Sequence, residues 1–260
     1  MEIIKDKTNT FPFRLWFEDG EIEQLAERRR SDCISLLKLP NDPALSVDKF
    51  IELYLPKALE TEIILDPYAD LQKIEGPDVP GATYFYNDHL EIKIDRGLTD
   101  EAEKTSMWGR YNSTAMHEAA HCILHPVLFR GDLNQQKLFT LTASKKISCL
   151  RRTIEGYYTG EWWEYQANIA MANLLMPKEL FLAHFEMERD AYGIHSNRDL
   201  AEDQHIFGAV VGYLSNEFQV SKQAVVIRLQ VLKQIPDLHN RELFDGNGFV
   251  TIGDILLGGK

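Results

Sequence analysis

The chain is organised around the stretch Met116-His117-Glu118-Ala119-Ala120-His121-Cys122-Ile123-Leu124-His125. It contains the pattern His-Glu-x-x-His. Two histidines four residues apart lie above one another on one face of a helix, with about 5–6 Å between their Cβ atoms. Both rings can therefore bind one metal ion, while the glutamate between them points towards a water on that metal. The pattern predicts a zinc site with His117 and His121 as ligands and Glu118 as the catalytic base.

A third ligand has to come from elsewhere, because a catalytic zinc usually has three protein ligands and one open position. A ligand on an extended stretch would need a glycine and a histidine three and six residues after His121. Leu124 and Val127 stand at those positions, so this layout is excluded. His125 lies one turn beyond His121, where its ring would serve the same metal poorly, and we interpret it as structural.

The alternative is a carboxylate from a second helix. Glu164 is the favoured candidate, and Glu161, one turn earlier on the same face, is the second choice. Asn168 lies one turn after Glu164, where it could hydrogen-bond to a ligand and fix the orientation of a ring or carboxylate. The residues thus predict a metal site shared between two helices.

Three motifs together resemble the ImmA/IrrE family of zinc metallopeptidases. They are HEAAHCILH at 117–125, Glu-x-x-Ala-Asn at 164–168 and Leu-Leu-Met-Pro at 174–177. The resemblance extends upstream to Gly-Ala-Thr at 81–83 and downstream to a Phe-x-Val-Ser-x-x-Ala-x-x-x-Arg-Leu pattern at 218–229, and so covers roughly 60–235. The first motif alone would identify only a zincin, whereas the combination is fairly specific.

The resemblance implies that zinc is held by His117, His121 and Glu164, with Glu118 as the base. Two positions depart from the family pattern. Ala120 stands where a glycine often precedes the second histidine, and Ala170 stands where an aromatic residue often follows the asparagine. Neither is a ligand, but both can reshape the packing around the site.

The resemblance also implies a substrate, namely a helix-turn-helix transcriptional repressor that is cut in a stress or mobile-element response. The negative charge that develops on the attacked carbonyl oxygen needs a further hydrogen-bond donor. Tyr157, Tyr158, His184 and a backbone N–H remain alternatives for it. A rival hypothesis is a regulatory protein with a structural zinc that binds a repressor or DNA without cutting. Glu118 argues against it, because a closed structural site has no use for a base.

Hydrophobic periodicity and capping residues predict most of the helices. The expected helices are 21–30, 46–55, a region opening at 99–101, 113–125, 161–177, 198–217 and 221–234. Ser46, Ser113 or Thr114, and Ser221 are the expected N-caps, and Pro56 is expected to end the second helix.

A hairpin is expected directly upstream of the metal-binding helix. Residues 82–86 and 90–94 are rich in β-formers, and Asn87-Asp88 between them is typical of a turn. We expect this hairpin to supply an edge strand beside a cleft. Residues 130–160 are less regular, and the glycine-rich residues 246–259 suggest a loop-and-strand tail.

Residues 198–234 have the pattern of a helix-turn-helix segment. Their formal charge is zero, from four basic and four acidic residues, whereas DNA-reading helices are usually distinctly basic. We therefore expect this segment to pack on the core or to dock substrate rather than to bind DNA.

The predicted fold class is α+β, with a minimal zincin-like metallopeptidase domain of helices and a small sheet or hairpin. Residues 1–60 are expected to be an N-terminal extension, 61–190 the metallopeptidase core, and 191–260 a helix-turn-helix-like segment with a short tail packed on the core.

Composition is consistent with a cytoplasmic enzyme. The net charge of −12 disfavours non-specific nucleic-acid binding. No apolar run approaches the 18 or so residues of a membrane span, and the first residues lack the apolar segment of a secretion signal. The three cysteines form no CxxC pair, which favours a reducing compartment. The run Arg28-Arg29-Arg30 is expected to be a solvated helix end.

Overall fold

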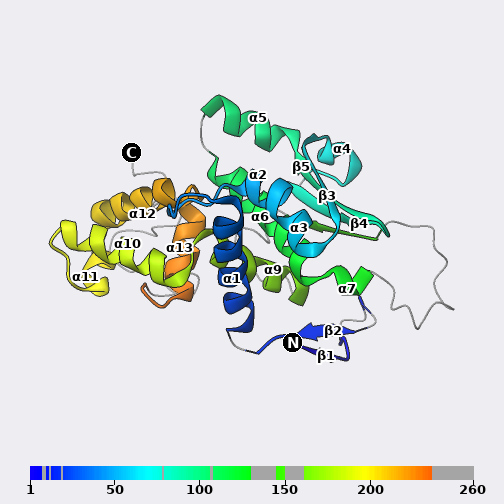
Figure 1. Cartoon of the computed structure of the whole chain (residues 1–260). Coiled ribbons are helices and arrows are strands. Elements are labelled where there is room, and N and C mark those ends of the chain that lie inside the picture. The colour runs from blue at the N-terminus through cyan, green and yellow to red at the C-terminus, as the bar shows by residue number, and fades with distance from the viewer. Residues whose placement is uncertain are drawn as a thin grey trace.

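The computed structural model describes residues 1–7, 10–11, 13–18, 20–77, 79–105, 108–129, 145–149 and 161–235. These residues form a mixed α+β fold that is mostly helical, with two small sheets (Figure 1). The expected α+β class is thus confirmed. Tyr157, Tyr158 and the tail at 246–259 lie outside the described residues. Within the described ranges, no helix has both the length and the apolar character that crossing a membrane requires.

The larger sheet has four strands in the order β3-β5-β4-β6. They are β3 (Glu62–Ala69), β4 (Gly81–Phe85), β5 (His89–Asp95) and β6 (Lys145–Cys149). β3 runs parallel to β5, and β4 is antiparallel to both β5 and β6.

The expected hairpin is confirmed as β4 and β5, but its expected position as a sheet edge is wrong. β6 pairs along the whole of β4, from Gly81 opposite Cys149 to Phe85 opposite Lys145. The segment of β6, Lys-Lys-Ile-Ser-Cys, has no clear strand pattern of its own. Its pairing depends on the strand beside it, and such tertiary context routinely overrides local propensity.

Helix α6 (Gly109–Leu124) carries the His-Glu-x-x-His pattern and packs against β4, β5 and α9 (Trp162–Leu175). It begins four residues before the expected start. The hydroxyl of Ser113 donates to the Gly109 carbonyl inside the helix, so Ser113 is not its N-cap. A serine can bond back to the carbonyl four residues earlier within a helix, and local sequence does not distinguish this from capping.

The N-terminal part combines a two-stranded antiparallel sheet with a long helix. Strands β1 (Glu2–Ile4) and β2 (Arg14–Trp16) pair, and α1 (Glu21–Leu37) packs along α9. The expectation of a solvated arginine run is wrong for Arg30, which is buried. A guanidinium has five N–H donors, and Arg30 uses its own on carbonyls that only the folded chain brings together.

Pro56 does not end the second expected helix. The helical segment continues through α2 (Val47–Lys49), a π-helical turn η1 (Phe50–Tyr54) and α3 (Leu55–Leu59). Pro56 stands in the first turn of α3. Backbone N–H groups in a first turn have no acceptor within their own helix, so a proline there costs no hydrogen bond of that helix. Ser46 is the N-cap residue of α2, as expected, but its side chain forms no capping hydrogen bond.

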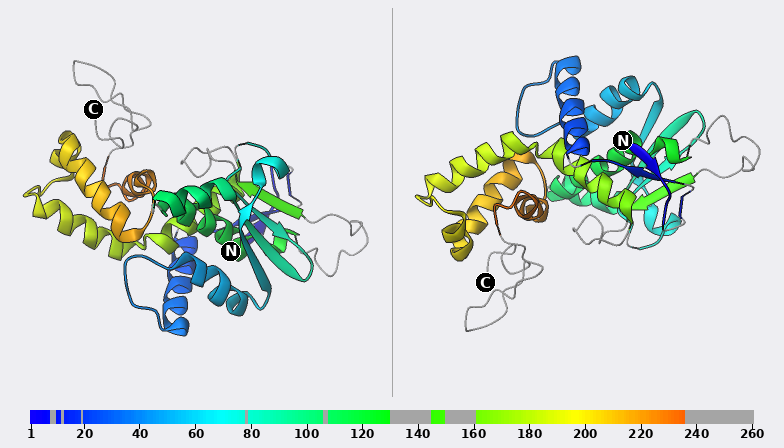
Figure 2. Two further views of the ribbon diagram at one scale, coloured as in Figure 1. Left: turned by 90° about the horizontal axis from the view of Figure 1, so that it is seen from above. Right: turned by 90° about the horizontal axis from the view of Figure 1, so that it is seen from below.

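The helices after α9 gather on one side of α6, and the larger sheet lies on the other (Figures 1 and 2). They are α10 (Lys178–Ala191), α11 (Asn197–Glu202), α12 (Gln204–Phe218) and α13 (Lys222–Val231). α10 has no counterpart among the expected helices, and the expected helix 198–217 is divided at Asp203. The carboxylate of Asp203 caps α12 and the hydroxyl of Ser221 caps α13, the latter as expected.

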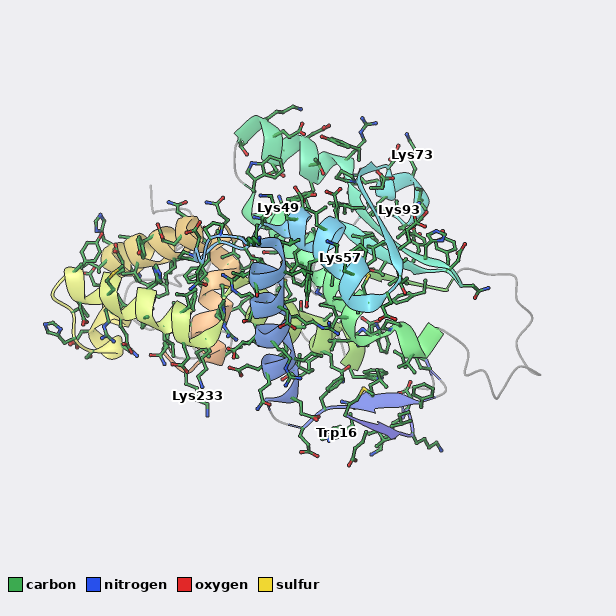
Figure 3. All side chains as sticks on the ribbon, viewed as in Figure 1. Trp16, Lys49, Lys57, Lys73, Lys93 and Lys233 are labelled. Atoms are coloured by element: carbon green, nitrogen blue, oxygen red, sulfur yellow. The ribbon has the colours of Figure 1, made fainter. Side chains whose placement is uncertain are left out.

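Three short helices complete the described fold. α4 (Leu71–Ile74) follows β3, α5 (Arg96–Thr105) follows β5, and α7 (Pro126–Phe129) follows α6. The lysines labelled in Figure 3 are spread over several of these and neighbouring elements rather than gathered on one face.

Candidate metal centre

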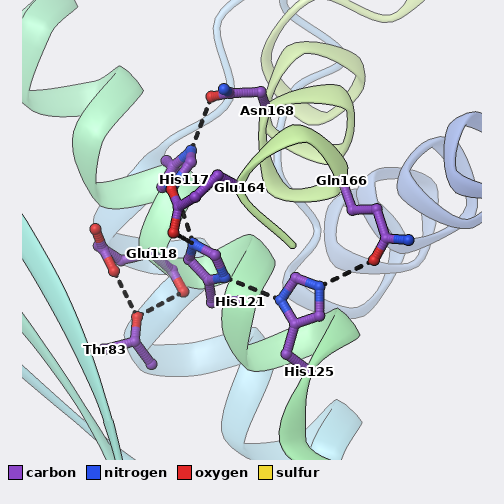
Figure 4. Close-up of polar contacts among 8 residues, drawn as sticks. All are labelled: Thr83, His117, Glu118, His121, His125, Glu164, Gln166 and Asn168. Atoms are coloured by element: carbon purple, nitrogen blue, oxygen red, sulfur yellow. Dashed lines mark hydrogen bonds and ion pairs between the residues drawn. The ribbon is translucent and has the colours of Figure 1, made fainter. Parts of the chain in front are cut away.

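Three buried side chains from two helices converge on one another (Figure 4). His117 and His121 come from α6, and Glu164 comes from the first turn of α9. The two Nε2 atoms are 3.0 Å apart. Glu164 Oε2 lies 3.0 Å from His117 Nε2, and Glu164 Oε1 lies 3.4 Å from His121 Nε2. The structure thus brings together the three predicted ligands.

These distances fit a metal ion bound by all three groups. Ligands about 2.0–2.1 Å from a tetrahedral metal are about 3.3 Å from one another. The buried Glu164 Oε1 also has no hydrogen-bond partner within the described part of the chain. A buried oxygen without a partner costs free energy, and a metal ion would remove that cost.

Small side chains allow the two ligand-bearing helices to pack closely. Ala120 of α6 and Ala167 and Ala170 of α9 are buried in one cluster with Ile22 and Leu124. Short side chains at a helix contact permit a small interaxial distance. The two positions that depart from the family pattern, Ala120 and Ala170, therefore lie in the same contact, and Ile22 of α1 shares it.

Asn168 occupies the position expected of a residue that orients a ligand. Its Oδ1 lies 2.9 Å from His117 Nδ1. An amide oxygen only accepts, so Nδ1 of His117 carries the proton in this bond and Nε2 remains available for a metal. Glu161, the second choice for a ligand, is the N-cap of α9 and is not one of the three converging groups.

His125 is buried and faces away from the metal position, in accord with a supporting role. Its Nδ1 lies 2.9 Å from His121 Nδ1, and its Nε2 lies 3.1 Å from Gln166 Oε1. Gln166 Nε2 in turn donates to the carbonyl of Leu15 at 2.7 Å. The sequence reasoning missed Gln166. Gln166 is a polar residue two positions after Glu164 on α9, and this alone does not predict a contact with His125.

Glu118 is fully buried, and its two carboxylate oxygens have different surroundings. The Thr83 hydroxyl lies 2.7 Å from Oε2 and 3.1 Å from the Glu118 carbonyl. Oε1 has no hydrogen-bond partner among the described residues. It lies beside Gly81, where an added Cβ would be only 2.7 Å away. One oxygen is thus held and the other is kept clear.

Burial dominates the electrostatics of this cluster. It raises the pKa of Glu118 to about 8, although His117 and Thr83 act in the opposite direction. It lowers the pKa of His125 to about 3, so this ring is neutral at physiological pH. Burial opposes ionisation of Glu164 too, but the adjacent His121 and His117 prevail and lower the pKa of that carboxyl.

The structure does not bring His184 to the cluster. Its Nδ1 lies 3.0 Å from the Tyr213 hydroxyl, and its ring packs on Phe218, so it belongs to the contact between α10 and α12. The group that would stabilise a carbonyl oxygen during reaction is thus not His184 in this arrangement.

Comparison with known proteins assigns this part of the chain to a family. Residues 105–230 match the family Peptidase_M78, described as the IrrE N-terminal-like domain. The matched range runs from the end of α5 into α13 and includes all three converging side chains, Glu118 and Asn168. The β4–β5 hairpin, which resembled the family by sequence, precedes the matched range. No curated protein matches the chain.

Proposed function

Residues 105–230 belong to the Peptidase_M78 family of metallopeptidase domains, and we propose that the chain is a zinc-dependent endopeptidase of minimal zincin type. The observation that carries this proposal is the pairing of a buried three-donor site with Glu118. The Oε1 atom of Glu118 is clear of hydrogen bonds in the described structure, one residue after His117.

The donor set supports zinc. Two imidazole nitrogens and one carboxylate oxygen form a three-ligand set typical of catalytic zinc, with a position left for water or substrate. When bound, zinc supplies Lewis-acid polarisation of a carbonyl and a water whose pKa is lowered to about 7. His117, His121 and Glu164 would hold the ion.

The chain's own residues prepare Glu118 to accept a proton. Thr83 fixes Oε2, and the missing side chain of Gly81 leaves room beside Oε1. A base whose pKa lies near the working pH accepts and releases a proton efficiently. Burial raises the pKa of Glu118 to about 8 in the absence of a cation, and a metal ion beside it would lower that pKa towards the working pH.

For the substrate we propose a helix-turn-helix transcriptional repressor, cut in the cytoplasm during a stress or mobile-element response. The family resemblance supports this choice. The α12–α13 segment is less suited to DNA, because Arg228 is buried against α9 rather than available for phosphate. The turn of this segment is also packed on α6, since a Cβ added to Gly109 would lie 2.5 Å from the Val220 carbonyl carbon.

The experiment is incubation of the zinc-loaded protein with the helix-turn-helix repressor encoded nearest to its gene. We expect one discrete shortened product, identified by mass spectrometry. A Glu118→Gln variant should bind zinc in the same ratio and leave the repressor intact. Cleavage by this variant at the wild-type rate would remove the proposed mechanism. A repressor that binds the wild-type protein but is never cut would favour the rival role of a non-proteolytic regulator.

A further inference from the structure

We propose that His125 and Gln166 are positioning residues for the metal ligand His121. In this proposal the carbonyl of Leu15, on the N-terminal strand β2, sets the direction of the hydrogen bonds that join them. The inference rests on the proposed metal site. It assigns a role in that site to a strand that lies outside residues 105–230.

The Leu15 carbonyl fixes which atom donates and which accepts in each of these hydrogen bonds. A backbone carbonyl can only accept a hydrogen bond, so Gln166 must present its Nε2 to Leu15 O, at 2.7 Å. The amide therefore cannot be flipped without leaving two acceptors facing each other. Its oxygen, Oε1, must face His125 Nε2, at 3.1 Å.

The proton positions of the two histidines follow in turn. Because Gln166 Oε1 can only accept, His125 must donate from Nε2. A neutral imidazole that is protonated on Nε2 has a bare Nδ1, which accepts from the Nδ1–H of His121 at 2.9 Å. His121 then has a bare Nε2, and this atom faces His117 Nε2 and the Glu164 carboxylate.

The opposite tautomer of His121 would block the site, because its proton would sit on Nε2 among the three converging atoms. Among the described residues, His125 and its partners are shielded from water. Leu15 and His125 are fully buried, and Gln166 is 5% exposed. Trp162 covers the His125 ring edge-on, with ring centroids 6.0 Å apart.

The two ligand histidines therefore have different supports. His117 is oriented by Asn168, which lies on the same helix as the third ligand. His121 is oriented through the side chains of His125, at the end of α6, and Gln166, on α9 (Figure 4). The Leu15 carbonyl on β2 completes this path. Partners of this kind commonly contribute about 10- to 100-fold to metal affinity.

The test is zinc affinity, measured by competition with a chromophoric chelator, which does not depend on cleavage. His125→Leu should weaken zinc binding by about 10- to 100-fold. His125→Asn offers an amide oxygen close to the position of Nδ1 and should restore most of the affinity. Trp162→Phe is the matched control, since it changes the packing on the same ring but removes no hydrogen bond to a described residue. This variant should bind zinc within about twofold of wild type.

Two further measurements separate positioning from general destabilisation. Gln166→Met should weaken zinc binding severalfold, and the double variant with His125→Leu should bind no more weakly than His125→Leu alone, because both changes interrupt one path. In the metal-free wild-type protein, long-range ¹H–¹⁵N NMR spectra should show the His121 proton on Nδ1.

Wild-type affinity in His125→Leu, additive losses in the double variant, or an Nε2 proton on metal-free His121 would each overturn the inference. If the wild-type protein itself binds no zinc, the proposed function fails as well. If it binds zinc but the variants do not differ from it, only this inference fails.

Discussion

At the scale of single residues, two small residues on β4 determine the surroundings of the Glu118 carboxylate. Thr83 donates to one oxygen, and Gly81 leaves space for the other. A Cβ at position 81 would also lie 2.8 Å from Thr114 Cγ2, so both neighbours on α6 would have to move. Glycine is required here by the close approach of helix and strand.

Gly81→Ala is expected to destabilise the protein by about 1–3 kcal/mol and to reduce cleavage, because overpacking displaces Glu118. Chemical denaturation measures the first effect. Gly212→Ala is the matched control, since a Cβ on that α12 residue meets nothing within 4 Å. The control should be neutral or slightly stabilising. Equal effects of the two substitutions would contradict the close approach.

Cys33 provides a test of burial away from the metal site. It is completely buried in α1, and burial raises the pKa of its thiol to about 11 from 9.0, against a small opposing effect of Arg30. The folded state therefore holds the proton more tightly than the unfolded state. The resulting stability is present below pH 9 and is lost as the pH rises through 11.

Between pH 8 and 11, Cys33 should therefore account for a loss of about 2 kcal/mol of unfolding free energy. Denaturation of the wild-type protein and Cys33→Ala across this range measures it. The variant starts less stable because it has lost buried volume, but its profile should be flatter by that amount. Parallel profiles for the two proteins would show that the thiol does not titrate as expected.

At the scale of elements, two buried arginines hold the end of the helix that carries Glu164. Arg30 of α1 donates to Leu174 O at 3.0 Å, and Arg228 of α13 donates to Met176 O at 3.1 Å. Cations near a helix C-terminus also interact favourably with its dipole. α9 is therefore attached to an element that precedes it in the chain by more than a hundred residues and to one that follows it.

Arg228→Met should destabilise the protein by about 2–4 kcal/mol, because it leaves Met176 O and Asn173 Oδ1 buried without their donor. Thermal or chemical denaturation checks this. The matched control is Lys222→Met, which removes a positive charge from an exposed position in the same helix and should change stability by less than about 0.5 kcal/mol. A large loss of stability in the control would indicate that the lost positive charge, and not the lost hydrogen bonds, destabilises Arg228→Met.

At the scale of the whole molecule, the site joins parts that are distant in sequence. α6 and α9 supply the three converging side chains, β4 holds Glu118 through Thr83, and β2 ends the hydrogen-bond path from His121. A ligand that binds only the folded state stabilises it by an amount that rises with its concentration over Kd. Metal binding should therefore raise the free energy of unfolding of the whole fold.

Removal of metal with a chelator should lower the thermal unfolding midpoint, and added zinc should restore it. At zinc concentrations about a thousand times Kd the expected gain is about 4 kcal/mol. Differential scanning calorimetry with and without zinc measures the shift. His117→Ala, which lacks one ligand, should show little response to either treatment. An unshifted wild-type midpoint would mean that no metal is bound at these three residues.

Local patterns in the sequence were sufficient for the features whose physical cause is local. The four-residue spacing placed His117 and His121 on one helix face, and the β4–β5 hairpin and the Ser221 cap followed from alternation and capping. Glu164 and Asn168 lie on one face of a single helix, so the sequence also predicted that these two side chains are neighbours. Their meeting with the histidines required the two helices to pack together.

Other features depend on groups that are far apart in the chain. β6 becomes a strand because β4 offers it a free edge, and Arg30 is buried because carbonyls from two distant segments surround it. The path from His121 to Leu15 spans more than a hundred residues. Buried polar residues with distant partners show no periodic pattern in the sequence, because only the folded protein brings their hydrogen-bond partners within reach. The sequence therefore determined that two histidines share one helix face with a glutamate between them, whereas the tertiary structure decided what holds these side chains in position.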